Sequence, residues 1–227
     1  MSMSLRVVVP PHPLIAHWLT LLRDQETPSP LFATAMAELG RWLTYEAVRD
    51  WLPQRPVAVQ TPLALTEGMV VDPSVPVLAV PVLRAGLGLW QGGQAVLPSA
   101  RVAHVGLVRD ERTGEADCYL DALPQRIGER VGVMVFDPML ATAGSLIQVL
   151  ERLQARGVSG QRLRVITALA ASSGLGTLGK RFPDLTVYTA CVDPELDEAF
   201  RIVPGLGDAG DRLYGSQSPV FPAEAQP

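Results

Sequence analysis

The segment RVGVMVFDPMLATAGSLIQVLERLQAR, residues 130–156, decides the fold. It begins with an almost unbroken apolar run over 130–136, and apolar residues then recur every three or four positions over 144–156. An apolar run without alternation is typical of a strand buried on both faces, and the second spacing is that of a helix with one buried face. A strand that leads through a short loop into a helix predicts a βα unit of a parallel sheet.

The same alternation extends over most of the chain. Helical spacing occurs at 12–24 and 31–51, and residues 57–71 have the pattern of a hairpin with its turn at Glu67-Gly68. Further apolar runs, each expected to be a buried strand, lie at 75–83, 101–108, 163–170 and 185–192. We therefore predict an α/β fold with a mostly parallel central sheet flanked by helices.

Composition and charge exclude several classes of protein. Of the 227 residues, 48% are hydrophobic and 19% charged, which is enough apolar material for a core and excludes a disordered chain. No apolar run approaches the ~20 residues that span a bilayer, so we expect a cytoplasmic protein without a membrane partner. The net charge is −4 without basic clusters, which argues against a nucleic-acid partner. We expect one domain over 1–216 and a disordered tail over 217–227.

Cysteine and histidine give no metal site. Cys118 and Cys191 lie far apart, form no CxxC motif and have no histidine cluster near them, which excludes a disulfide framework or a structural metal. Of the 19 basic residues, Lys180 alone is lysine, so an anion site in this chain has to use arginine forks, backbone amides or a metal ion.

The loop that follows the apolar run 130–136 is the first candidate site. Asp137 stands at the expected strand end, where a carboxylate can bind ribose hydroxyls. The loop then reaches Thr142, Gly144 and Ser145 at a helix start, where amide groups, hydroxyls and the helix dipole favour a phosphate. The alternative is that Asp137 only caps a loop and that Thr142 or Ser145 only caps the helix.

Two arginines also follow apolar runs. Arg84 ends a buried run and needs an anion or a carboxylate partner there. Arg109 ends another and opens a polar segment over 110–115, which by itself favours a solvated hairpin. A glycine-rich segment over 202–212 has too many glycines for a strand or helix interior. Its backbone can approach a ligand closely, or it is an ordinary exposed loop.

The run GLGTLG at 174–179 matches the GxGxxG pattern of dinucleotide-binding proteins, and Asp193 has the spacing of its acidic residue. Pro183 follows the last glycine so closely, however, that the long helix which should hold a pyrophosphate has no room. We therefore interpret this run as a short helix, which leaves a nicotinamide-dependent dehydrogenase as a weaker alternative.

Taken together, these residues resemble the uracil phosphoribosyltransferases, a family with the type I phosphoribosyltransferase fold. The resemblance extends from His12 to Gly215. It rests on motifs that occur in the family's order: Leu22-Arg23-Asp24, Tyr45-Glu46-Ala47, Thr61-Pro62, PVLRAGLG (81–88), GLVRD (106–110), residues 137–145 and PGLGDAGDR (204–212). The last motif is distinctive of the uracil-specific members. The resemblance also implies a β-arm, which follows Arg109, and a C-terminal hood.

The resemblance implies transfer of a phosphoribosyl group from 5-phosphoribosyl 1-diphosphate (PRPP) to N1 of uracil, giving UMP and pyrophosphate. It assigns catalytic roles to Arg109, Asp137 and Asp208, and uracil binding to Ile202, Gly207, Asp208 and Ala209. It implies Mg²⁺ carried by PRPP rather than by protein ligands, a GTP effector as in some members, and a homo-oligomer. PRPP would contact Arg84, Arg109, Asp137, Pro138, Met139, Leu140, Ala141, Thr142, Ala143, Gly144, Ser145 and Asp208.

The chain departs from the family pattern at two places. Ala143 stands where the family usually has the first of two glycines, and we expect a negative φ there, so that Ala143→Gly hardly changes PRPP affinity. The arm, residues 116–121, is acidic and lacks the lysine often found nearby. The alternative function is a uracil-nucleotide-binding regulator on the same fold without efficient catalysis.

Overall fold

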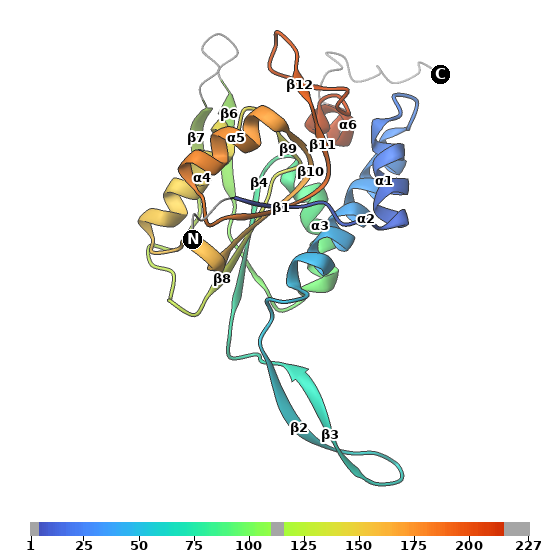
Figure 1. Cartoon of the computed structure of the whole chain (residues 1–227), viewed down its shortest axis with the longest axis vertical. Helices are drawn as coiled ribbons and strands as arrows, with labels where there is room; N and C mark the ends of the chain where they lie inside the picture. Colours follow the sequence, from blue (N-terminus) through green and yellow to red (C-terminus); the bar gives the residue numbers. More distant parts are fainter. Residues whose placement is uncertain (1–4, 110–115, 216–227) are drawn as a thin grey trace, which may run out of the picture.

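The computed structural model describes residues 5–109 and 116–215, and within them the chain folds around one large sheet. Its strands are β1 (Arg6–Val8), β4 (Val77–Leu83), β5 (Arg101–Val102), β6 (Val105–Arg109), β7 (Ala116–Asp121), β8 (Gly132–Phe136), β9 (Met139–Leu140), β10 (Leu163–Ala171) and β11 (Thr186–Asp193). The strand order is β1-β11-β10-β8-β4-β6-β7, with β5 beside β4 and β9 beside β10. Every pair is parallel except β6 with β7, which confirms the expected sheet (Figure 1).

Both faces of the sheet are buried, as the unbroken apolar runs predict. In β8, Val133 and Val135 belong to the core on one face, whereas Met134 and Phe136 belong to the core on the other. Successive side chains of a strand point to opposite faces, so a strand covered on both sides has to be apolar throughout. The carboxyl ends of β4 and β8 lie side by side, because these two strands pair in parallel.

Three helices cover one face: α1 (Pro13–Arg23), α2 (Ser29–Val48) and α3 (Gly86–Val96) (Figure 1). The glycine-rich α3 packs closely against α2. A Cβ at Gly92 would lie 1.7 Å from the carbonyl oxygen of Ala37, so no larger residue fits there. Helix α3 begins two residues after Arg84, and its tight packing fixes the chain that follows β4.

The other face is covered by α4 (Gly144–Ala155) and α5 (Ser172–Arg181), with the short 3₁₀ helix η1 (Gly160–Arg162) before β10. The GxGxxG run lies inside α5, which starts before Gly174 and spans 10 residues. These glycines therefore do not form the turn before a long helix, and the dinucleotide-binding interpretation is wrong. Gly174 has a packing role instead, because its Cβ would lie 2.0 Å from the carbonyl oxygen of Ala141.

Two smaller sheets extend from this body. The hairpin of β2 (Gln54–Gln60) and β3 (Leu65–Val71) is confirmed and projects away from the main sheet (Figure 1). Its predicted turn is wrong: Gly68 pairs with Val57 inside the ladder, and the chain reverses between Thr61 and Ala64. The second is the antiparallel pair of β12 (Glu195–Leu196) and β13 (Ile202–Val203), which helix α6 (Ala209–Tyr214) follows.

Candidate functional site

A pocket of ≈ 250 Å³ lies at the carboxyl ends of β4 and β8 and is called here the strand-end pocket. It brings together Arg84, Asp137, Ser145 and Asp208, which come from four separate parts of the sequence. Its lining is Val82, Leu83, Arg84, Ala85, Leu107, Asp137, Pro138, Met139, Ser145, Asp208, Ala209 and Gly210. In a parallel sheet this edge is where ligands bind, so these four sequence-predicted residues meet at the expected place. The predicted residues Leu140, Thr142, Ala143 and Gly144 line neither this pocket nor the one described below.

Asp137 is held by the sheet on both sides of the residue. Its backbone N–H donates to Ile166 of β10 at 3.1 Å, and the next carbonyl, that of Pro138, accepts from two successive amides of β10, also at 3.1 Å. One oxygen of its half-buried carboxylate lies 3.5 Å from the Met139 amide nitrogen. The carboxylate is therefore presented from a rigid strand end.

The loop after Asp137 leads through β9 into the N-terminus of α4. Residue Ala143 is the N-cap of α4 and offers no side-chain hydrogen bond to the first turn. Amides of a first helical turn that have no capping side chain suit an anion, because they point outward at the positive end of the dipole. Thr142 accepts from the Gly144 amide at 3.4 Å.

The expected negative φ at Ala143 is wrong. Its φ is 69°, in the left-handed region, and its side chain is buried. The neighbouring contacts explain this conformation: β9 pairs with β10 on one side, and the Ala141 carbonyl sits against Gly174 of α5 on the other. These contacts fix where the loop runs, and the chain has to turn sharply at Ala143 to enter α4.

A second pocket of ≈ 300 Å³, called here the C-terminal pocket, adjoins the first. The two share Met139, Asp208 and Ala209. The C-terminal pocket is lined by Met139, Ala141, Phe200, Arg201, Ile202, Gly207, Asp208 and Ala209. All four residues that the resemblance assigned to the base therefore surround one pocket.

The end of the glycine-rich segment is helical, contrary to expectation. Asp208 caps α6 by accepting from the Asp211 amide at 2.9 Å. The glycines before it do form an irregular turn, in which Gly205 and Gly207 have φ values of 63° and 78°. Asp208, the N-cap of the six-residue helix α6, and Ala209, its first residue, lie on the border between the two pockets.

Sequence reasoning missed three residues of the site. Tyr214 of α6 donates from its hydroxyl to the Arg84 carbonyl at 3.2 Å, and the Arg84 guanidinium carbon lies 5.9 Å from the centre of its ring. Burial raises the pKa of Tyr214, although Arg84 opposes the shift, so the hydroxyl keeps its proton at neutral pH. Phe200 and Arg201 line the C-terminal pocket without belonging to any motif.

Arg109 is the last residue of β6, next to the strand that carries Arg84. Its side chain and residues 110–115 lie outside the described part of the chain, so its predicted contact with a ligand stays a prediction. Residues 116–121 form β7, which pairs with β6 as the expected arm. Arg156, the C-cap residue of α4, donates to Asp121 at the end of β7 at 2.9 Å.

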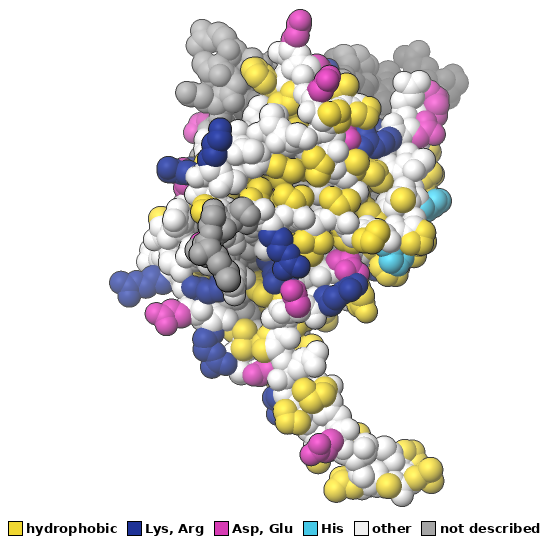
Figure 2. All heavy atoms as spheres, viewed as in Figure 1, with side chains coloured by type: hydrophobic (Ala, Val, Ile, Leu, Met, Phe, Trp, Pro, Cys, Tyr) yellow, Lys and Arg dark blue, Asp and Glu magenta, His cyan; other side chains and the backbone are white. Residues whose placement is uncertain are grey.

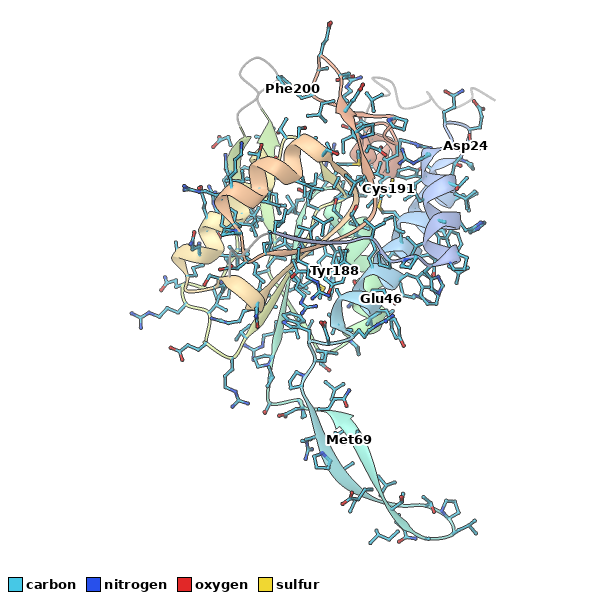
Figure 3. All side chains as sticks on the ribbon, in the orientation of Figure 1. Asp24, Glu46, Met69, Tyr188, Cys191 and Phe200 are labelled. Carbon is cyan, nitrogen blue, oxygen red and sulfur yellow. The ribbon has the colours of Figure 1, made fainter. Side chains whose placement is uncertain are left out.

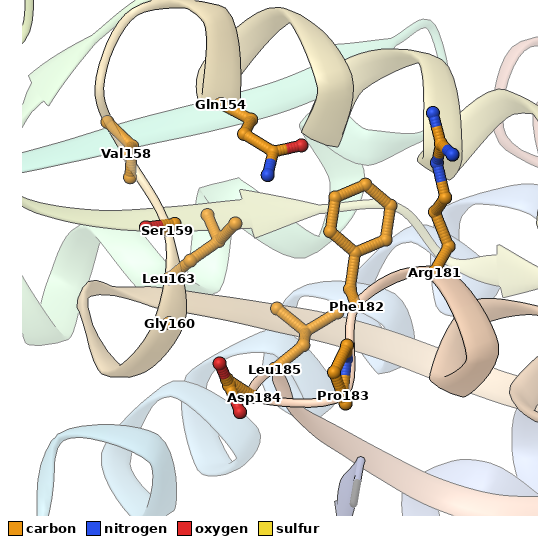
Figure 4. Close-up of a pocket in the computed structure, with 10 residues that line it drawn as sticks. All are labelled: Gln154, Val158, Ser159, Gly160, Leu163, Arg181, Phe182, Pro183, Asp184 and Leu185. Carbon is orange, nitrogen blue, oxygen red and sulfur yellow. The ribbon is translucent and has the colours of Figure 1, made fainter. Parts of the chain in front are cut away.

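A smaller pocket of ≈ 80 Å³ lies at the opposite edge of the sheet, between the ends of α4 and α5 (Figure 4). Leu163 and Leu185 line it at the amino-terminal side of β10 and β11. One oxygen of Asp184 is buried there without a hydrogen-bond partner within the described structure. This pocket is remote from the predicted residues.

Within residues 5–109 and 116–215, no helix is long and apolar enough to cross a membrane.

A family model described as uracil phosphoribosyltransferase matches residues 9–216. A uracil phosphoribosyltransferase of Synechococcus elongatus is 56% identical over 216 residues, which cover 95% of this chain and 100% of the relative. A chloroplastic one of Arabidopsis thaliana is 44% identical over 217 residues, 96% of this chain and 73% of the relative.

A solved structure of an Aquifex aeolicus protein superimposes with a TM-score of 0.83 at 34% identity, and the match covers 92% of this chain and 97% of that one. The residues that the family model matches, 9–216, include the lining of both pockets. The chain belongs to the uracil phosphoribosyltransferase family.

Proposed function

We propose that this chain transfers the 5-phosphoribosyl group of PRPP to N1 of uracil, giving UMP and pyrophosphate. The observation that carries the proposal is the pair of adjoining pockets at the carboxyl ends of β4 and β8. One has charged groups suited to a sugar diphosphate, and the other is lined largely by residues of the glycine-containing segment 200–209, which suits a small base. Membership of the family supports the same reaction. The regulator alternative has no support from the comparisons.

The reaction breaks the bond between C1 of the ribose and the pyrophosphate oxygen, which keeps the electron pair, while N1 of uracil forms its bond to C1 and releases its proton to the pyrophosphate or to water. Positive charge develops on the ribose and negative charge on the leaving group. We propose that Asp137 binds the ribose hydroxyls and that Arg84 and Arg109 stabilise the pyrophosphate. Residues 138–145 would wrap the 5-phosphate at the N-terminus of α4. Asp208, on the border of the pockets, would face both reactants.

Magnesium fits this donor set when it arrives with the substrate. Among the described residues, no three His, Cys, Asp or Glu side chains are grouped so that they could hold a metal ion. Asp137 and Asp208 nevertheless line the strand-end pocket, and Mg²⁺ is commonly held by one or two carboxylates together with substrate phosphates and water. When bound, it would neutralise charge on the pyrophosphate.

A GTP effector, a cytoplasmic location and a single domain over 1–216 stay predictions, and the expected tail lies outside the described residues.

The function is tested by mixing labelled uracil, PRPP and Mg²⁺ with the purified chain and measuring labelled UMP and pyrophosphate. Equal amounts of both products, formed only when all three components are present, are expected. Labelled uracil that stays unchanged with a folded protein would refute the proposed activity. Uracil nucleotides that bind without turnover would support the regulator instead.

Ala143→Gly is expected to stabilise the protein. An alanine in the left-handed region costs about 1 kcal/mol or more, which for a domain of this size corresponds to about 2–4 °C in Tm. PRPP binding is expected to tighten, because the strained residue belongs to the predicted phosphate loop. Calorimetry of unfolding and of PRPP binding measures both effects. Ala141→Gly is the matched control: Ala141 has an ordinary φ, so glycine there should lower the Tm.

We also propose that the chain forms a homo-oligomer through the β2–β3 hairpin. Hydrophobic side chains stand along this hairpin far from the core (Figure 2). Leu63 at its turn is 96% exposed and Leu65 is 70% exposed. Exposed apolar surface of this extent is typical of an interaction site, and a second copy of the chain is the partner that every preparation contains.

The double variant Leu63→Ser/Leu65→Ser is expected to reduce self-association, because it removes the most exposed apolar side chains of the hairpin. Sedimentation equilibrium should show the dissociation constant rising at least ~10-fold. Leu31→Ser, which changes a partly exposed leucine of α2 in another region, should leave it unchanged. Equal association of both variants and the wild type would exclude the hairpin as the interface.

A further inference from the structure

Arg23 and Asp193 form a bidentate ion pair that contacts Gly205, in the turn between Ile202 and Gly207 of the C-terminal pocket. The two guanidinium nitrogens of Arg23, at the end of α1, donate to the two carboxylate oxygens of Asp193, at the end of β11, at 3.0 and 2.6 Å. The side chain of Asp193 is 4% exposed. Burial alone would raise its pKa, but the bonds from Arg23 and the Gly205 amide outweigh burial and lower it. Asp193 is therefore ionised at neutral pH.

The pair holds both backbone groups of one residue in the glycine-rich turn. The Gly205 amide donates to Asp193 at 3.0 Å, and the Gly205 carbonyl accepts from Arg23 at 2.9 Å. Gly205 also has no room for a side chain, because its Cβ would lie 2.1 Å from the Ile202 carbonyl oxygen. Arg23, Asp193 and Gly205 thus close a ring of hydrogen bonds.

Arg212 provides a second set of hydrogen bonds that connects the end of α1 to the same turn. Its guanidinium donates to the carbonyl of Leu206 at 2.8 Å, to that of Asp24 at 2.6 Å and to that of Leu22. It lies 4.2 Å from the centre of the Phe32 ring. Asp24, which follows α1, and Cys191, on β11, lie in the same half of the molecule as Phe200 (Figure 3).

The residues so fixed are the neighbours of the pocket lining. Ile202, Gly207 and Asp208 line the C-terminal pocket, whereas Arg23, Asp193 and Gly205 do not. Gly205 lies between Ile202 and Gly207 in the chain, so its anchoring determines where the backbone groups on either side point. Preorganised backbone groups discriminate between ligands only while their positions are fixed to a fraction of an ångström.

We propose that Arg23 and Asp193 are positioning residues for the base: their ion pair holds the turn over 202–208 in the conformation that binds uracil. The proposal rests on the proposed function. It assigns to α1, a helix that contributes no residue to the lining of either pocket, an effect that falls mainly on the base. Of the charged residues that line the strand-end pocket, Asp208 alone belongs to this turn, whereas Arg84 and Asp137 follow β4 and β8.

The test compares Michaelis constants in Asp193→Asn, measured for each substrate with the other saturating. The amide keeps the shape of the carboxylate but loses the charge that orients Arg23. We expect the KM for uracil to rise about tenfold and the KM for PRPP to stay within twofold. Arg23→Lys is the second variant: lysine keeps the charge, but it has no fork that reaches Asp193 and Gly205 together. In Arg23→Lys we again expect the KM for uracil to rise and the KM for PRPP to stay within twofold, with a smaller rise in the uracil KM than in Asp193→Asn.

Asp50→Asn is the matched control. Asp50 pairs with buried Arg164 at 3.0 Å, and Arg164 lies near the amino-terminal start of β10, at the opposite edge of the sheet. Its uracil KM should not change. A uracil KM within twofold of wild type in folded, active Asp193→Asn and Arg23→Lys, or an equal rise in both Michaelis constants, would overturn the proposal. If the wild type makes no UMP, the proposed function itself has failed.

Discussion

Uracil is expected to be used at least ~100-fold more efficiently than cytosine, measured as kcat/KM. Ile202 and residues 207–209 line the C-terminal pocket, and we expect their backbone amides and carbonyls to bind the base. Uracil offers an acceptor at O2, a donor at N3 and an acceptor at O4, which fixed amide and carbonyl groups can match. Cytosine has an acceptor at N3 and a donor at C4, so two buried backbone groups would face like groups.

The size of the effect follows from the cost of each mismatch. A buried polar group without its partner costs about 1–3 kcal/mol, and two of them at about 1.4 kcal/mol each already give ~100-fold discrimination. Fluorine at C5 leaves the hydrogen-bond pattern intact, so 5-fluorouracil should be accepted.

Competition between uracil, 5-fluorouracil, cytosine and hypoxanthine at saturating PRPP measures these ratios directly. Comparable kcat/KM for cytosine or hypoxanthine would show that the pocket is wrongly assigned, and that the segment PGLGDAGDR does not indicate uracil. A rate for 5-fluorouracil as low as that for cytosine would point to steric rather than hydrogen-bond selection.

The βα units could be predicted from sequence because their signals are local. The apolar runs at 75–83, 130–136 and 163–170 correspond to β4, β8 and β10, and α4 follows the predicted spacing within a residue. Asp137 could be found for the same reason, since a polar residue that ends an apolar run has to lie at the edge of the sheet.

Features that depend on distant parts of the chain could not be predicted in this way. The φ of Ala143 is decided by contacts of its loop with β10 and α5, which no local pattern contains. Asp193 carried a local signal that was misleading, because its spacing suited a dinucleotide fingerprint. Its partner Arg23 is 170 residues away in the sequence, so the pair forms only because the fold brings the ends of α1 and β11 together.

The turn of the β2–β3 hairpin has a local sequence signal at Thr61-Pro62 and not at Gly68, where the turn is predicted. The Thr61 hydroxyl accepts from the Leu63 and Ala64 amides, at 3.2 and 3.0 Å. A threonine before proline is a turn signal of its own. The glycine sits inside β3 beside Val59, where its Cβ would lie 3.2 Å from that side chain.

Asp137→Asn is expected to lower the PRPP-dependent rate at least ~10-fold, a loss of ~1.4 kcal/mol or more of transition-state binding. The amide can still accept from the Met139 amide, so the loop should keep its conformation. What it loses is the negative charge beside a ribose that becomes positive, together with an acceptor for the ribose hydroxyls. Arg109→Ala is expected to lower the rate as much, because Arg109 ends β6 and matches a family motif whose arginine binds pyrophosphate.

Two control variants separate these effects from general damage. Asp184→Asn makes the same change at the opposite edge of the sheet, in the pocket of Figure 4, and Arg101→Ala removes an exposed arginine from β5. Both should keep the wild-type kcat/KM for PRPP in steady-state assays of pyrophosphate release. Asp137→Asn and Arg109→Ala that stay folded and within twofold of wild type would contradict the site assignment. A loss confined to Asp137→Asn would support the ribose site and contradict the assignment of Arg109 to the pyrophosphate.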